Sequence, residues 1–275
     1  MSVARIATRF ADLKSAGRAA FIPYVVAGDP DAETSWRILK GLPKAGADLI
    51  ELGLPFSDPM ADGPAVQRGA ARALQGGMTL SRVLELVRRF RAEDSVTPLI
   101  LMGYFNPILN HGLDAFARDA ASAGVDGLIM VDVPPEEAEP LADALDARDI
   151  ALIRLATPTS DEDRLATIAR RTSGFVYVVS VTGVTGGKEA DAAAVTALVE
   201  RVRTSCGLPA AVGFGIRTPE RAAEVARIAD AAVVGSALVD AISESVAINR
   251  DPTTNVLDTV AAMAQAVHSA REDFE

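Results

Sequence analysis

The sequence has very few cysteines and histidines, and this scarcity excludes several kinds of chemistry. Its 275 residues include one cysteine and two histidines. Cys206 cannot form an internal disulfide, which is typical of proteins in a reducing compartment, so we expect a cytoplasmic location. His111 and His268 lie far apart and belong to no ligand-spaced cluster. The composition therefore predicts no metal site and gives no support for Ser-His-Asp or Cys-His catalysis.

Basic residues and long apolar runs are also scarce. The chain has 27 Lys and Arg against 37 Asp and Glu, a formal net charge of −10. Nucleic acid and anionic membranes attract positively charged surfaces, so we expect neither as a partner. No apolar run approaches the roughly 20 residues of a transmembrane helix, and the first ten residues show no signal-peptide pattern. An anionic substrate must then be held by local groups such as backbone N–H.

Short apolar runs alternate with amphipathic segments along the whole chain. Most of the runs are continuously apolar, as expected for parallel strands that are covered on both faces. The segments between them have helical periodicity, with a capping box predicted at Ser160 and Asp163 and a helix start at Thr218-Pro219. The predicted strands are 21–26, 48–52, 98–103, 126–131, 150–155, 174–179, 209–213 and 231–235.

Eight βα units in a chain of this length predict an α/β protein with a closed (β/α)₈ TIM barrel. Additional helices are expected at 2–15 and 254–271, and no segment resembles a linker, so residues 1–275 are predicted to form a single domain. A doubly wound open sheet is the alternative. It is disfavoured because no G-x-G-x-x-G follows the first strand.

Carboxylates follow the second strand, where a barrel would place reacting groups. Glu51 lies in the strand itself, and burying a carboxylate costs several kcal/mol unless it has a partner or a role. Asp58 and Asp62 follow in a loop rich in Pro and Gly. Glu51 and Asp62 are therefore candidate catalytic groups. An ion pair for Glu51 and solvated turn positions for the aspartates are the alternatives.

Glycine-rich segments follow three late strands, at 183–187, 213–216 and 235–238. Glycine allows backbone N–H groups to approach an anion closely, and a helix start adds a favourable dipole. The loops after strands seven and eight form the recurrent phosphate site of barrel enzymes. Together these segments predict a phosphate site, although any one of them alone could be an ordinary turn.

The segment LIELGLPFSDPMADGP, residues 49–64, resembles the signature of the tryptophan synthase α chain family. The resemblance implies retro-aldol cleavage of indole-3-glycerol phosphate to indole and glyceraldehyde 3-phosphate. It gives Glu51 the role of protonating indole C3 and Asp62 that of accepting the indole N–H. Similar segments recur in the family's order over essentially the whole chain: 21–30, 101–109, 131–137, 177–187, 213–216 and 233–239.

The resemblance also implies binding residues and partners. Loops 53–64 and 180–189 would close over the substrate, with Thr185 meeting Asp62. Asp58 and Pro59 would face a β chain in an αββα assembly. Pyridoxal phosphate would be carried by that β chain alone, and no cofactor is expected in this chain. The implied phosphate residues are Gly186, Gly215, Gly235 and Ser236, and the implied indole pocket is Tyr24, Met102, Ile129, Tyr177 and Phe214.

Other functions remain open at this stage. A stand-alone lyase that releases indole would have the same active site, and a non-catalytic allosteric binding subunit is a further alternative. Another phosphate-binding barrel would require a Schiff-base lysine at a strand end, but Lys14, Lys40, Lys44 and Lys188 are all predicted in helices or loops. In the fifth strand, we expect a structural ion pair for Arg154.

Overall fold

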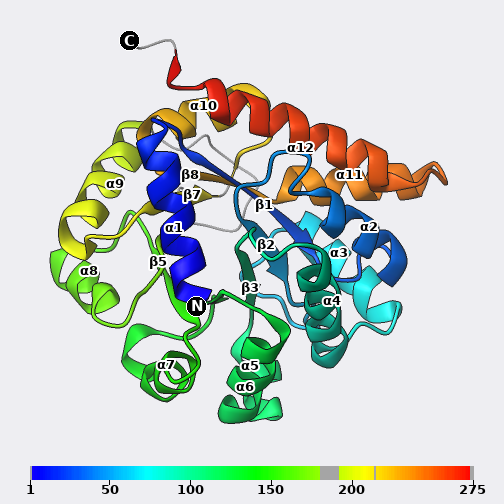
Figure 1. Ribbon diagram of the computed structural model, residues 1–275, viewed down its shortest axis with the longest axis horizontal. Coiled ribbons are helices and arrows are strands. Elements are labelled where there is room, and N and C mark those ends of the chain that lie inside the picture. The colour runs from blue at the N-terminus through cyan, green and yellow to red at the C-terminus, as the bar shows by residue number, and fades with distance from the viewer. Residues whose placement is uncertain (1, 180–191, 214, 273–275) are drawn as a thin grey trace.

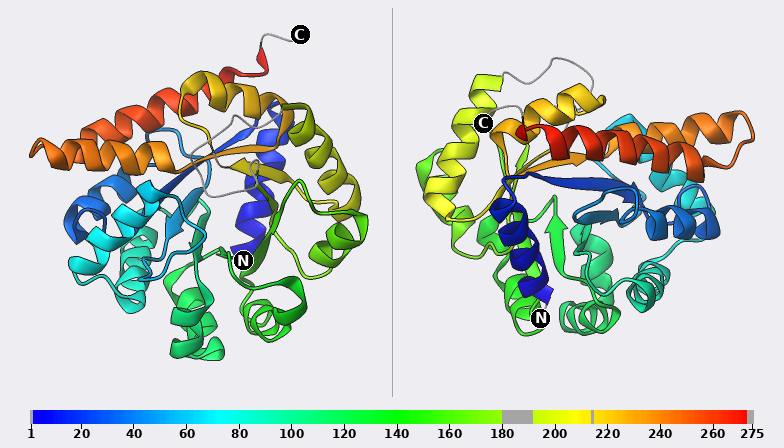
Figure 2. Two further views of the ribbon diagram at one scale, coloured as in Figure 1. Left: turned by 180° about the vertical axis from the view of Figure 1, so that it is seen from behind. Right: turned by 45° about the horizontal axis from the view of Figure 1, so that its top comes forward.

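The computed structural model describes residues 2–179, 192–213 and 215–272. In this part of the chain, eight parallel strands close into a barrel in sequence order, β1 to β8, and helices surround it (Figures 1 and 2). The predicted α/β TIM barrel is confirmed. The strands are β1 (Ala20–Val26), β2 (Ile50–Gly53), β3 (Leu99–Gly103), β4 (Gly127–Met130), β5 (Ala151–Ala156), β6 (Val176–Val179), β7 (Ala210–Gly213) and β8 (Ala231–Val234).

The described helices include both predicted additions, α1 near the start of the chain and α12 near its end. Thr218 caps α10 and Pro219 occupies its first turn, as predicted. The described helices are α1 (Ser2–Ser15), α2 (Ala32–Gly41), α3 (Pro64–Gln75), α4 (Leu80–Glu93), α5 (Phe105–His111), α6 (Leu113–Ala123), η1 (Pro135–Glu137), α7 (Glu139–Asp146), α8 (Glu162–Ala169), α9 (Ala192–Cys206), α10 (Pro219–Ile228), α11 (Ser236–Ala247) and α12 (Pro252–Ser269).

The capping box predicted at Ser160 and Asp163 is wrong by one residue. Asp161 is the N-cap of α8, and its side chain accepts the backbone N–H of Arg164. The Ser160 hydroxyl instead accepts the backbone N–H of Thr157, which closes the turn before the helix. Serine and aspartate both make such bonds, so the local pattern could not distinguish the two positions.

Strand register shows which side chains point into the barrel. Tyr24 pairs with Glu51 across β1 and β2, while Gly53 pairs with Met102 across β2 and β3. Met102 pairs in turn with Ile129 on β4. Paired residues of parallel strands share a face, and residues two apart in one strand share it as well. All five positions therefore belong to the same, inner face of the barrel.

At the amino ends of the strands, a two-bond clamp recurs before each even-numbered strand. In each clamp, one residue donates its backbone N–H to a carbonyl on the preceding strand, and its side chain accepts the N–H of that same partner residue. The four clamps tie the strands together in pairs at the end of the barrel away from the candidate site. The clamped pairs are Asp48 with Phe21, Asp126 with Leu99, Ser173 with Leu152, and Asp230 with Ala210.

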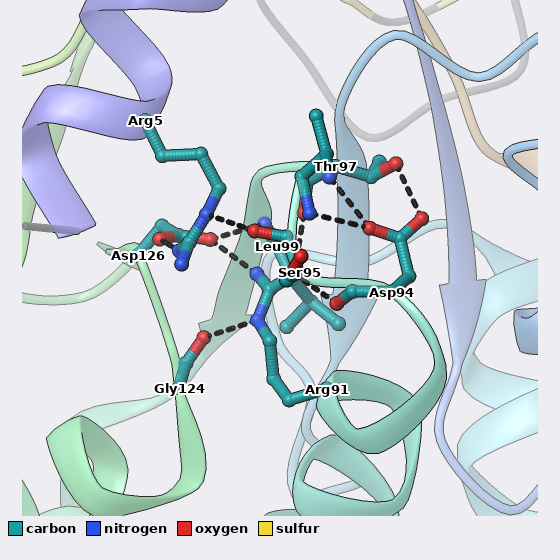
Figure 3. A network of polar contacts seen from close by, with 9 residues as sticks. Arg5, Arg91, Asp94, Ser95, Thr97, Leu99, Gly124 and Asp126 are labelled. Atoms are coloured by element: carbon teal, nitrogen blue, oxygen red, sulfur yellow. Dashed lines mark hydrogen bonds and ion pairs between the residues drawn. The ribbon is translucent and has the colours of Figure 1, made fainter.

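Basic side chains from distant segments complete the three aspartate clamps. Asp126, with a fully buried side chain, accepts hydrogen bonds from Arg5 of α1 and Arg91 of α4 (Figure 3). Asp48 lies 2.8 Å from the ring nitrogen Nε2 of His268 in α12. Through these contacts the terminal helices α1 and α12 are attached to the end of the barrel formed by the amino ends of the strands. Asp230 is bound in the same way by Arg203 of α9, at 2.9 and 3.1 Å.

Arg154 does not form the expected ion pair. Its register partner on β6 is Val176, one position out of phase with the inner face, so the side chain points toward the helix layer. No carboxylate lies within ion-pairing distance of Arg154 in the described residues, and its buried Nε has no hydrogen-bond partner. Burial and the nearby Arg171 lower the pKa of this guanidinium.

Candidate active site

Glu51 lies on the inner face of β2, at the carboxyl end of the barrel. Its side chain is 2% exposed, and its Oε2 atom has no hydrogen-bond partner among the described residues. Burial, with the negative charge of Asp62 added, raises the pKa of Glu51 to about 8. The carboxyl group is therefore protonated at neutral pH and can act as a proton donor. The ion pair considered as an alternative for Glu51 is absent from the described structure.

Asp62 lies in the loop between β2 and α3 and is partly buried. Burial raises the pKa of Asp62 to about 6, while a hydrogen bond from the Tyr104 side chain opposes this rise. At neutral pH Asp62 is mainly ionised. The two candidate carboxylates thus interact with each other and still differ in protonation state, which is the arrangement expected of an acid and a charge stabiliser.

Tyr104 is a site residue that our sequence analysis did not identify. It directly follows β3, and its hydroxyl accepts the backbone N–H of Ala61 at 2.9 Å. Its ring stacks on Phe56 with a centroid distance of 5.2 Å. The available signal was its position: a tyrosine immediately after the third strand lies at the same end of the barrel as Glu51.

Two glycines at strand ends make room for tyrosine hydroxyls. A Cβ atom at Gly53 would lie 2.3 Å from the Tyr24 hydroxyl, and one at Gly213 would lie 1.9 Å from the Tyr177 hydroxyl. Any side chain at either glycine would displace the ring. Burial raises the pKa of both tyrosines, and the charges of Glu51 and Asp62 add to the effect. Tyr24 and Tyr177 therefore share one low-dielectric space with the two carboxylates.

The predicted apolar pocket is brought together in part. Met102 and Ile129 are buried neighbours on the inner face of β3 and β4. Tyr24 and Tyr177 belong to the same hydrophobic core. Phe214, also predicted for this pocket, lies outside the described residues. The four described residues provide an apolar environment on the side of the barrel that carries Glu51.

Three of the predicted phosphate-binding positions can be compared with the structure. Gly215 is exposed and has a φ of +78°, a conformation that favours glycine. Gly235 is the N-cap of α11 and Ser236 is its first residue, and no side chain caps this helix start. A helix start with free N–H groups is favourable for an anion. Gly186 and Thr185 lie outside the described residues, as does the whole of the predicted lid 180–189.

The outer part of the β2–α3 loop is exposed. Asp58 is exposed and accepts a hydrogen bond from the Ser57 hydroxyl, and Pro59 is half-buried. Beside them Met60 is 78% exposed, and on α5 Leu109 is 54% exposed. These two exposed apolar side chains lie on segments that follow β2 and β3 at the carboxyl end of the barrel.

Neither a metal cluster nor a catalytic lysine is found in the described part of the chain. No group of three or more His, Cys, Asp or Glu residues there could hold a metal ion. Lys14 and Lys40 lie in α1 and α2, and Lys44 lies in the turn after α2. Lys188 lies outside the described residues. The described groups at this site are carboxylates, tyrosines and backbone groups. None of the described helices is long and apolar enough to cross a membrane.

Comparisons with known proteins identify a family that this chain resembles. Residues 10–269 match the family model described as tryptophan synthase alpha chain. The tryptophan synthase alpha chain of Phenylobacterium zucineum is 67% identical, over 100% of this chain and 99% of its own length. That of Caulobacter vibrioides is 63% identical, over 98% of each chain.

Solved structures give the same result for the fold. Tryptophan synthase subunit alpha from Legionella pneumophila superposes with a TM-score of 0.89 at 40% identity, over 96% of this chain and 98% of the other. A structure of tryptophan synthase from Mycobacterium tuberculosis gives a TM-score of 0.87 at 36% identity, with 96% and 98% coverage.

Proposed function

The chain belongs to the tryptophan synthase alpha chain family, and we propose that Glu51 and Asp62 carry out that family's lyase reaction. The reaction cleaves indole-3-glycerol phosphate into indole and glyceraldehyde 3-phosphate. The observation that supports these two residues most directly is their opposite protonation at neutral pH. The pKa of buried Glu51 is about 8 and that of Asp62 is about 6.

The proposed reaction begins with a proton transfer. Glu51 donates its proton to indole C3, which interrupts the aromaticity of the ring and leaves positive charge on the ring nitrogen. The Asp62 carboxylate accepts the hydrogen bond of the indole N–H and stabilises this charge. Because the site is buried, the electrostatic stabilisation is larger than it would be in water.

Cleavage of a carbon–carbon bond then restores the aromaticity of the indole ring. The bond between C3 and the adjoining glycerol carbon breaks, and its electron pair returns to the ring and neutralises the nitrogen. The hydroxyl on that glycerol carbon becomes the aldehyde oxygen as its proton passes to the Glu51 carboxylate. Glu51 is protonated again, so the cycle consumes no proton and requires no Schiff base or metal.

We further propose how the remaining groups bind the substrate. Tyr24, Met102, Ile129 and Tyr177 would hold the indole, together with Phe214. Backbone N–H groups at Gly215, Gly235 and Ser236, with Gly186, would hold the phosphate. An anion held by backbone and helix dipole fits a chain with a net charge of −10. Thr185 would meet Asp62 when the loops close.

The proposed partner is a tryptophan synthase β chain in an αββα assembly, which carries pyridoxal phosphate and consumes the indole. Asp58 and Pro59 would face it, and the exposed side chains of Met60 and Leu109 support a protein contact at this end of the barrel. We also propose a cytoplasmic location and a single domain over residues 1–275.

A direct assay tests the proposal. Purified protein is mixed with indole-3-glycerol phosphate, and indole is measured with and without a β chain. We expect indole in both conditions and faster release with the β chain. Absence of indole in both would refute the enzyme function and favour a non-catalytic binding subunit, whereas release unaffected by the β chain would indicate a stand-alone lyase.

A further inference from the structure

We propose that Tyr104 is a positioning residue for this reaction: its buried hydroxyl links the Ala61 backbone to the Asp62 side chain and holds that carboxylate in one orientation. The inference rests on the proposed role of Asp62. Tyr104 would act through Asp62 without touching the reacting atoms of the substrate.

The hydrogen-bond directions at the Tyr104 hydroxyl follow from simple chemistry. The backbone N–H of Ala61 can only donate, and it does so to the hydroxyl oxygen at 2.9 Å. The hydroxyl proton therefore remains for another acceptor, and an ionised carboxylate can only accept. We assign that proton to the Asp62 side chain, which directly follows Ala61 in the chain and whose pKa is lowered by a hydrogen bond from Tyr104. The hydroxyl would then join two adjacent residues of the β2–α3 loop.

Tyr104 itself has little freedom to move. It is 3% exposed, and its ring stacks on Phe56 with a centroid distance of 5.2 Å and an interplanar angle of 30°. Phe56 belongs to the same loop as Asp62, so the loop contacts Tyr104 at two places. A side chain on the rigid end of β3 thereby fixes a loop residue, which catalysis by a positioned carboxylate requires.

The charged and titratable groups around Asp62 explain why this bond matters. Glu51 on β2, Tyr24 on β1 and Tyr177 on β6 all interact electrostatically with Asp62, and Asp132 after β4 interacts with Tyr104. None of these groups is a cation. Burial raises the pKa of Asp62, and the Tyr104 hydrogen bond is the effect that opposes the rise. Without this bond a larger fraction of Asp62 would be protonated.

The test replaces Tyr104 by phenylalanine, which removes only the hydroxyl. We expect kcat to fall about tenfold with KM changed less than about twofold, as for loss of one hydrogen bond to a charged group. The acidic limb of the kcat–pH profile should move up by roughly one unit, so that raising the pH restores part of the activity. A loss from general disruption of structure would be independent of pH.

Ser245→Ala provides the matched control. The Ser245 hydroxyl is also buried, donates one hydrogen bond, to the Ala241 carbonyl, and accepts one, from Asn255. It lies near the end of α11, far along that helix from Ser236. We expect this variant to keep the wild-type kcat and acidic limb, even if its unfolding midpoint falls by as much as that of Tyr104→Phe.

Two further variants, Asp62→Asn alone and Asp62→Asn combined with Tyr104→Phe, distinguish a failure of this inference from a failure of the proposed role of Asp62. If Tyr104 acts through Asp62, adding Tyr104→Phe to Asp62→Asn should cause no further loss of kcat. Additive losses, or a Tyr104→Phe enzyme with wild-type kcat and acidic limb, would overturn the inference while leaving the proposed function intact. Wild-type turnover in Asp62→Asn alone would overturn the proposed role of Asp62 itself.

Discussion

At the amino ends of the strands Asp126 accepts bonds from two arginines and a backbone N–H, whereas at the carboxyl ends the Oε2 atom of Glu51 has no hydrogen-bond partner among the described residues. Both side chains are almost completely buried. The difference lies in their neighbours: Asp126 is surrounded by cations and Glu51 by tyrosines and another carboxylate. Burial raises the pKa of Asp126 while Arg91 and Arg5 oppose the rise, and its contacts hold segments together. Glu51 is arranged to keep its proton until a substrate takes it.

The comparison shows how a barrel separates stability from chemistry. The aspartate clamps tie strands and terminal helices together at one end, where no substrate-binding loop is needed. The buried carboxylates Glu51 and Asp62 at the other end cost stability, and this cost is reflected in their raised pKa values. Variants at the two ends should therefore change different properties.

The largest effect is expected from Asp126→Ala. Removal of the carboxylate leaves Arg5 and Arg91 facing each other without a counter-ion, and loss of one partner of a buried pair costs about 3–5 kcal/mol. Urea unfolding would measure the change, with exposed Asp258→Ala as a control within about 0.5 kcal/mol. Turnover of the folded variant should stay normal. A loss below 1 kcal/mol would show that the cluster is not important for stability.

Glu51→Gln should have effects opposite to those of Asp126→Ala, because it should lower turnover and not stability. Turnover should fall by about 10²–10⁴-fold with substrate binding largely kept, since the general acid is lost. The pKa of Glu51 is raised from 4.5 to about 8, so the unfolded chain ionises first. The stability contribution of the carboxyl is full below pH 4.5 and is lost as the pH rises through 8. The glutamine variant should thus be more stable at pH 8, by roughly 1–3 kcal/mol, and should match wild type near pH 4. Near-normal turnover would exclude Glu51 as the acid.

The pH profile of kcat depends on both carboxylates. Activity should rise as Asp62 ionises, near pH 6, and fall as Glu51 ionises, near pH 8. Because the groups interact, the two apparent pKa values belong to the pair. Steady-state assays from pH 5 to 9 would measure this bell-shaped dependence of kcat on pH. In Asp62→Asn the basic limb should move to lower pH, since the negative charge that raises the pKa of Glu51 is removed. An unmoved basic limb would contradict their coupling.

The smallest effect is expected from Ser173→Ala. Ser173 makes the same clamp as the three aspartates, but with a hydroxyl that accepts the Leu152 N–H at 3.2 Å. Its loss should cost about 1 kcal/mol, as for one neutral hydrogen bond. Urea unfolding beside Asp126→Ala would show how much of the aspartate effect is due to the cations. Equal losses would mean that the backbone bond alone accounts for both.

Some features of the site could be predicted from the sequence because they depend on local patterns. Continuous apolar runs gave all eight strands to within one or two residues, and a carboxylate inside such a run identified Glu51. Other features could not be predicted. The Arg5–Asp126 contact joins residues 121 apart, and no periodicity connects Tyr104 to Asp62. Likewise, an arginine in an apolar strand suggested an ion pair, but no carboxylate of the described residues lies within ion-pairing distance of Arg154.

The sequence by itself determined the barrel, the two carboxylates and the glycine-rich ends of the late strands, because burial patterns and residue types are local properties. The tertiary structure alone decided the state of each carboxylate. Asp126, Glu51 and Asp62 are the same chemical group, and their pKa values and roles depend on which distant side chains the fold brings within a few ångströms. Electrostatic energy in a buried site depends on these distances and on the absence of water, and neither is encoded in any short segment of the chain.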